Sequence, residues 1–89
     1  METRVAVMSI IVENGDTAEN AISVEKINAY LHQYGEYIIG RMGIPYRRRG
    51  INIISIALDA PQDTIAALSG KIGALAGVSV KTAYSSVGA

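Results

Sequence analysis

The sequence EYIIGRMGIPYRRRGINIISIALD, residues 36–59, holds two short apolar runs on either side of a basic turn. Both runs are rich in β-branched residues and too short for typical helices, which favours strands. Pro45 cannot donate a hydrogen bond to a neighbouring strand, so we expect the first strand to end there. Gly50 can adopt a positive φ where the chain turns back. The stretch therefore predicts a β-hairpin whose tip carries Arg47–Arg49.

A helix is predicted before this hairpin. Residues 17–34 have helical spacing, with an apolar stripe made of Val24, Ile27, Leu31 and Tyr34. Two starts are open for this helix, because Asp16 with Glu19 would form a capping box whereas Ser23 would cap a shorter helix. Gly35 is the expected end.

A second helix and a last strand are predicted after the hairpin. Asp59 is suited to cap the helix, Pro61 to its first turn, and Gln62 to reach back to the cap. The apolar stripe of this helix consists of Ile65, Leu68, Ile72 and Leu75. Gly77 is the expected end. Residues 78–84 then alternate between apolar and polar, which is typical of a half-buried strand.

These segments predict an α+β fold. Residues 5–13 are apolar on both parities and indicate a central strand. The resulting βαββαβ order is that of a ferredoxin-like sandwich, with both helices on one face of a four-stranded antiparallel sheet. The expected sheet order is fourth, first, third, second strand, and residues 1–89 form a single domain. The expected core contains Ile27, Leu31, Ile54, Ile56, Leu58, Leu68 and Ile72.

The face of the sheet away from the helices is predicted to be apolar. If Ile54, Ile56 and Leu58 face the helices, alternation sends their neighbours outward. The outward set on the first and third strands is then Val7, Ser9, Ile11, Ile53, Ser55 and Ala57. Such a face is too apolar for water alone, so we expect it to form the interface of a homodimer or homotetramer.

The composition excludes several classes of function. Eight basic and eight acidic residues cancel, which argues against a general nucleic-acid or membrane-surface binder. The absence of cysteine excludes disulfides, zinc–thiolate sites, iron–sulfur ligation and thiol catalysis. No stretch reads as a secretion signal or reaches the length of a membrane span. We therefore expect a cytoplasmic protein with no cofactor and no membrane partner.

The motif Tyr37–Tyr46, followed by Gly50–Ser55 and Asp59–Asp63, resembles a family of proposed iron-only hydrogenase system regulators. These are small proteins with an ACT-like fold, similar to the C-terminal domain of the nickel-responsive repressor. The resemblance extends to Glu25–Asn28 and to Leu68–Gly73. It implies a ligand-responsive regulatory domain that assembles as dimers or tetramers.

The resemblance does not extend to every part of the chain. Extra residues stand at 17–23, before the first helix. Nor does it carry over nickel ligands, because the repressor's site needs several histidines and a cysteine, whereas this chain has only His32 and no cysteine. By analogy with ACT-like domains, a ligand would lie near residues 13–16 or 59–62. We expect no bound metal.

The hairpin carries the candidate ligand-binding residues. The guanidinium groups of Arg47, Arg48 and Arg49, with Arg41 nearby in sequence, are suited to a carboxylate or a phosphate. The alternative is a tip that charge merely keeps solvated. Tyr46 would either stack on a ligand or pack beside the base of the hairpin.

Two classes of function remain. The first is a regulatory or sensory module, not an enzyme, that acts as a homo-oligomer through an unknown small ligand or protein partner. The second is a small ferredoxin-like enzyme with an active site at a subunit interface. Catalysis needs a converging acid–base set, and His32 and the arginines lie on separate elements, which favours regulation. Three arginines at one tip supply phosphate contacts but no base recognition, so we expect no sequence-specific nucleic-acid binding by the chain alone.

Overall fold

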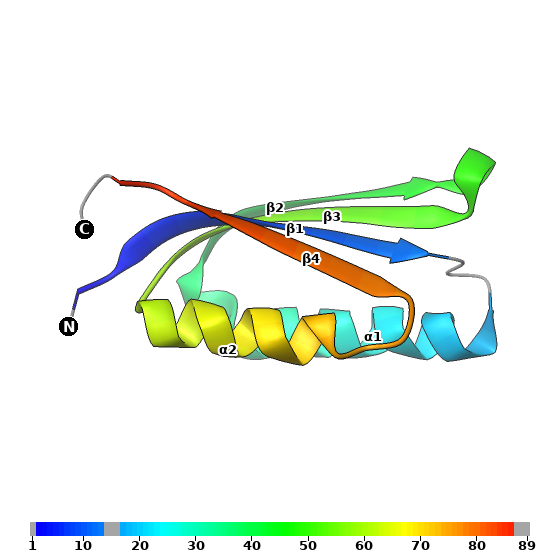
Figure 1. Cartoon of the computed structure of the whole chain (residues 1–89), viewed down its shortest axis with the longest axis horizontal. Helices are drawn as coiled ribbons and strands as arrows, with labels where there is room; N and C mark the ends of the chain where they lie inside the picture. Colours follow the sequence, from blue (N-terminus) through cyan, green and yellow to red (C-terminus); the bar gives the residue numbers. More distant parts are fainter. Residues whose placement is uncertain (1, 14–16, 87–89) are drawn as a thin grey trace.

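The computed structural model describes residues 2–13 and 17–86 and confirms the predicted α+β fold (Figure 1). The sheet and helix elements are β1 (Arg4–Glu13), α1 (Ala18–Gln33), β2 (Ile38–Tyr46), β3 (Ile51–Ala60), α2 (Gln62–Gly73) and β4 (Val78–Tyr84). Two short 3-10 segments, η1 (Gly35–Tyr37) and η2 (Arg47–Arg49), precede and follow β2. Within the described residues, no helix is long and apolar enough to cross a membrane.

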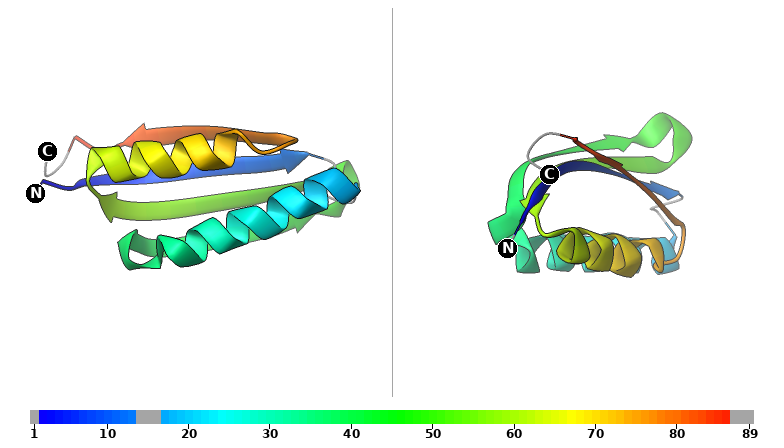
Figure 2. Two further views of the ribbon diagram at one scale, coloured as in Figure 1. Left: turned by 90° about the horizontal axis from the view of Figure 1, so that it is seen from below. Right: turned by 60° about the vertical axis from the view of Figure 1, so that its left-hand side comes forward.

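The sheet has the predicted order and direction. Its strands lie in the order β2-β3-β1-β4, and each neighbouring pair is antiparallel. The two helices lie side by side along one face of the sheet and leave the other face uncovered (Figure 2). The tip of the β2–β3 hairpin lies at the same end of the molecule as the start of α1 and rises away from the helices (Figure 1).

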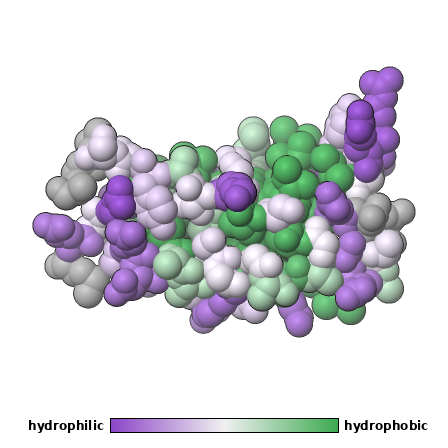
Figure 3. Space-filling view, in the orientation of Figure 1, coloured by the Kyte–Doolittle hydropathy of each residue, from purple (hydrophilic) through white to green (hydrophobic). Residues whose placement is uncertain are grey.

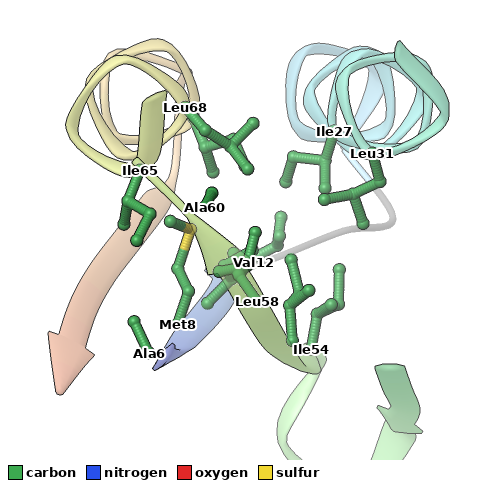
Figure 4. Packing of buried hydrophobic residues seen from close by; sticks show 13 residues of the cluster. Ala6, Met8, Val12, Ile27, Leu31, Ile54, Leu58, Ala60, Ile65 and Leu68 are labelled. Carbon is green, nitrogen blue, oxygen red and sulfur yellow. The ribbon is translucent and has the colours of Figure 1, made fainter. Parts of the chain in front are cut away.

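The core lies between the helices and the inward side of the sheet. In Figure 4 the side chains of Ile27 and Leu31 from α1 and of Ile65 and Leu68 from α2 point toward the strands. All seven residues that the sequence predicted for the core are buried. The inward residues of β1 complete it, namely Ala6, Met8, Ile10 and Val12. Since every second residue of β1 is buried and the others are exposed, β1 has one face in the core.

The hairpin differs from the prediction at one point. Gly50 adopts the expected positive φ of 65°, but Pro45 does not end the strand, which continues to Tyr46. Pro45 is tolerated opposite Asn52 because β2 is an edge strand, where a missing N–H can face solvent without breaking a ladder bond. An irregularity between Ile38 and Gly40 shifts the register at the other end of β2.

The sequence left two starts open for α1, and the structure excludes the shorter helix. Thr17 is the N-cap, and its hydroxyl accepts a hydrogen bond from the Asn20 N–H at 3.2 Å. Ser23 caps nothing; it is buried within the helix and donates its hydroxyl to the Ala76 carbonyl at 2.8 Å. The alternative cap, Asp16, lies outside the described residues. The helix ends at Gln33, two residues before the expected Gly35.

The predicted ends of α2 were also wrong. Asp59 does not cap the helix but belongs to β3, where it pairs with Val5 of β1. Pro61 is the N-cap position, with no side-chain cap. The helix ends at Gly73, and Gly77 instead forms the turn into β4 with φ 71°. The difference at Asp59 arises because strand pairing with β1 extends further than the local helix signals indicate.

We expect Leu68→Ala to lower the free energy of unfolding by about 2–5 kcal/mol, because removing a fully buried side chain leaves a cavity under α2. A urea titration followed by circular dichroism, at one protein concentration, measures this loss. Leu75→Ala is the control, because Leu75 is only half-buried and its truncation should cost less. Equal losses for the two variants would contradict the central place of Leu68.

Candidate functional site

The face of the sheet away from the helices, which we call the open face, is unusual because it is apolar and yet exposed. It exposes large apolar side chains on neighbouring strands, among them Val7 (43% exposed), Ile11 (40%), Met42 (51%) and Ile44 (44%). Figure 3 shows hydrophobic residues along the upper side of the molecule, over the sheet, and hydrophilic residues at the hairpin end. Contiguous apolar patches on a surface mark sites of interaction.

The structure places the predicted outward residues together on this open face. Val7, Ser9 and Ile11 of β1 lie opposite Ala57, Ser55 and Ile53 of β3, respectively. Their inward neighbours on both strands are buried, so the predicted alternation holds. Their role in an interface between copies of the chain stays a prediction.

Sequence reasoning missed the part that β2 contributes to the open face. Met42 lies opposite Ser55, and Ile44 lies opposite Ile53, so both side chains extend the face outward from β3. The available signal was the hairpin register: once Gly50 fixes the turn, Tyr46 must pair with Ile51 and the outward positions of β2 follow.

A shallow hollow lies on the open face, toward the end away from the hairpin tip. Its volume is about 330 Å³. Its floor is low because Gly40 and Ala57, which pair across β2 and β3, have little or no side chain. The lining residues are Val7, Gly40, Arg41, Met42, Ser55 and Ala57.

The three arginines of the tip form η2, and all are exposed. Across the described part of the chain, the guanidinium groups of Arg47–Arg49 make no hydrogen bond or ion pair. The turn is held by its main chain, in which the Gly50 N–H donates to the Arg47 carbonyl at 3.1 Å. A second hollow of about 400 Å³ adjoins the tip, between Arg49 and Glu13, over Ile11 and Ile51. The tip therefore presents free cationic donors beside an apolar surface.

Arg41 is not brought together with the tip arginines. It lies opposite Ile56, at a helix-facing position of β2, and donates to the Asn28 Oδ1 of α1 at 3.3 Å. From Arg41 to the end of β2 the strand extends roughly 15 Å. Tyr46 does lie beside the tip, opposite Ile51, and is 40% exposed.

A tyrosine–lysine cluster joins the two helices on the opposite side of the molecule. Lys71 of α2 donates to the Tyr34 hydroxyl at 2.8 Å. Its ammonium lies 5.0 Å from the Tyr34 ring centroid and 5.8 Å from that of Tyr30. Such cation–π contacts at exposed sites contribute about 0.5–1 kcal/mol each. Sequence analysis did not single out this cluster, which serves to hold α1 against α2.

His32 stands apart from the arginines. It is exposed near the end of α1, which leads into the start of β2, whereas the tip follows the end of β2 (Figure 1). The length of β2 separates the two, roughly 30 Å. Among residues 2–13 and 17–86, no cluster of three or more His, Cys, Asp or Glu side chains could hold a metal ion. The expectation that the protein binds no metal stays a prediction.

The two turns expected near a ligand are engaged in internal contacts where they are described. At the first, the Glu13 N–H donates to the Gly77 carbonyl at 2.8 Å, and the Asn20 side chain donates to the Glu13 carbonyl at 2.5 Å. Residues 14–16 lie outside the described residues. At the second, Arg4 donates to the Gln62 side chain at 3.3 Å and lies 4.7 Å from the Tyr84 ring centroid. Both junctions therefore tie the sheet to the adjoining helix.

Comparison with known proteins identifies relatives of this chain. Residues 4–82 match the TM1266-like family, described as an iron-only hydrogenase system regulator whose role is proposed. Among solved structures, the uncharacterized protein TM1266 from Thermotoga maritima is 37% identical with a TM-score of 0.83. That match covers 93% of this chain and 98% of that one. The family resemblance inferred from the hairpin motif is thus confirmed.

A more distant likeness concerns the fold alone. A formyltetrahydrofolate deformylase from Pseudomonas putida KT2440 is 15% identical, with a TM-score of 0.56. The match covers 89% of this chain but only 28% of the deformylase. None of the curated proteins matches this sequence.

We expect Gly77→Ala to lower the free energy of unfolding by about 1–3 kcal/mol, through strain at positive φ and displacement of the Asn20 side chain. A Cβ at residue 77 would lie 2.5 Å from the Asn20 Nδ2. Gly70→Ala is the control: no atom lies within 4 Å of its added Cβ, and Ala is the better helix former. Thermal unfolding of both variants distinguishes them, and a Gly77→Ala protein as stable as the parent would contradict this account.

Proposed function

The chain belongs to the TM1266-like family of proposed iron-only hydrogenase system regulators, and on this premise we propose that it is a regulatory module of such a system. The match over residues 4–82 carries the proposal. The module does not itself catalyse a reaction. The distance between His32 and the tip arginines supports this, since an acid–base pair must meet at one place.

The module acts as a homo-oligomer assembled through the open face of its sheet. Three neighbouring strands, β2, β3 and β1, expose apolar side chains there, and water alone is a poor environment for so continuous a surface. The interface residues on the two central strands are Val7, Ser9, Ile11, Ile53, Ser55 and Ala57. A dimer or a tetramer satisfies this requirement.

The hairpin tip binds the anionic group of a small ligand or a protein partner. Arg47, Arg48 and Arg49 offer guanidinium forks that match carboxylate and phosphate oxygens, and no described residue competes for them. Tyr46 adds an exposed aromatic ring at the same end of the hairpin. Arg41 lies too far along β2 to share this site. Its guanidinium instead donates a hydrogen bond to the Asn28 side chain of α1 and so links β2 to that helix.

Regulation passes through this ligand or partner, without sequence-specific DNA binding by the chain alone. The formal net charge is zero, and phosphate contacts from one basic tip carry no base information. In a symmetric oligomer the tips recur as separate patches. Such patches give weak, salt-sensitive binding to any duplex.

The proposal predicts that deleting the gene in its host changes the amount or activity of the iron-only hydrogenase. Hydrogenase activity and transcript level are measured in the parent, the deletion strain and strains complemented in trans. Wild-type protein should restore the parental level. Ile53→Lys should not, because an unpaired charge within the interface separates the subunits. A deletion strain that keeps parental transcript and activity under all growth conditions would refute the proposed function.

A second prediction concerns the arginine tip. Replacing Arg47, Arg48 and Arg49 together by Ala should leave fold and oligomer intact, because these exposed side chains make no hydrogen bond or ion pair within the described chain. Wild-type protein should bind a DNA duplex weakly and equally for promoter and scrambled sequences, and the triple variant should bind less. Fluorescence titration at physiological salt measures both. Nanomolar binding that prefers the promoter would contradict the proposed indirect mode of regulation.

A further inference from the structure

The open face has a gradient of side-chain size along its strands. One row across β2, β3 and β1, nearer the hairpin tip, consists of Ile44, Ile53 and Ile11, which are direct cross-strand neighbours. We call it the large row. Four residues further along β3, the small row consists of Gly40, Ala57 and Val7. Between the rows lie Met42, Ser55 and Ser9.

This gradient accounts for one of the two hollows, since the other, of about 400 Å³, lies beyond the large row over Ile11 and Ile51. The depression of about 330 Å³ lies over the small row, because the Gly40 and Ala57 positions leave space above the backbone. At the other end the large row consists of three isoleucines, whose side chains cover the backbone there; exposure does not separate the rows, since Val7 is 43% exposed and Ile11 40%. The face thus carries a ridge and a hollow of similar width, at equal distances from the central Ser55.

Ridge and hollow fit one another when a second copy is turned end for end. Consider a two-fold axis that lies in the plane between the two sheets, runs across the strands and passes at the level of Ser55. This axis places the large row of each copy over the small row of the other copy. Strand β3 then lies over β3, with Ile53 above Ala57 of the partner copy. An axis parallel to the strands sets large row against large row and leaves the two hollows facing each other. Packed sheets interdigitate their side chains, which favours the first arrangement.

One pair of opposite charges also fits this arrangement, although the exposed Glu13 beside the tip would lie near the other copy's arginines with the parallel axis. The tip arginines precede β3, and Asp59 lies exposed near its far end, opposite Val5. Turning one copy end for end brings each arginine tip toward the Asp59 of the other copy, whereas the parallel axis brings the two tips together. Lys81, on edge strand β4 opposite Ser9, can extend its ammonium past the rim of the sheet.

We propose that a second copy of this chain docks on the open face, turned end for end about this two-fold axis, with its large row seated in the hollow over the small row. This inference rests on the homo-oligomer of the proposed function and specifies its geometry. From strand spacing and rise, the face measures roughly 500 Å² in projection. Two such faces give roughly 1,000 Å² in all, which is the lower limit for a specific protein interface.

Engineered cysteines test this geometry directly, because the natural chain has none. In an Ile53→Cys/Ala57→Cys double variant, each new thiol faces its counterpart on the other copy, and oxidation with diamide should give a covalent dimer on a non-reducing gel. Within one chain the two positions are about 13 Å apart, beyond disulfide reach. Each single variant should stay monomeric on the same gel. Ser55→Cys, at the two-fold axis, should cross-link alone.

The controls separate a wrong geometry from a wrong function. Circular dichroism and light scattering before oxidation verify that each variant is folded and assembled like the parent. Cross-linking of Ile53→Cys alone would indicate the parallel axis and overturn the end-for-end arrangement. So would an intact dimer in which neither the double variant nor Ser55→Cys cross-links, or an unaltered protein that is monomeric at micromolar concentration. The gels test only the geometry of the dimer, whereas the hydrogenase response of the deletion strain tests the regulatory role. Failure of one proposal can therefore be told from failure of the other.

Discussion

The pairing of β1 with β3 is the constraint on which the rest of the structure depends. These central strands stay in register from Arg4 opposite Ala60 to Glu13 opposite Ile51. Because side chains alternate along a strand, this single register assigns every residue of both strands to the helices or to the open face. A slip by one residue would exchange the two sets, exposing Ile10 and Ile54 and burying the serines. Core and candidate interface are therefore two consequences of one arrangement.

Much of this arrangement could be predicted from the sequence, because it depends on periodicity. The strand order, the side that the helices cover and the alternation of β1 and β3 all follow from apolar spacing. The ends of β4 were predicted correctly, but several other element ends were not, since they depend on long-range pairing. Asp59 reads locally as a helix cap, yet β3 continues through it because Val5 is there to pair with. Pro45 reads as a strand end, yet an edge strand tolerates it.

The candidate site was predictable only in part, for a related reason. The outward residues of β1 and β3 follow from parity, but those of β2 depend on the register shift between Ile38 and Gly40. Sequence proximity placed Arg41 with the arginine tip, whereas parity sends it to the helix side of β2. The Lys71 contacts with Tyr30 and Tyr34 join separate helices, so no local pattern could indicate them. Composition indicates which chemical groups a chain carries, whereas the strand register determines which of those groups lie close together.

A sheet can associate with another chain in two ways, by adding a strand at its edge or by stacking on its face. In this protein the edge strand β2 carries features that hinder pairing, and the open face does not. Edge strands invite unwanted pairing, and proteins commonly interrupt them with proline or a bulge. Strand β2 carries both kinds of interruption, Pro45 near one end and the irregularity after Ile38 at the other. The open face has no such protection over its three strands β1, β2 and β3, where Val7, Ile11 and Ile44 meet solvent. A chain that blocks extension of its sheet at β2 while leaving this face apolar is organised for stacking of sheets rather than for their extension.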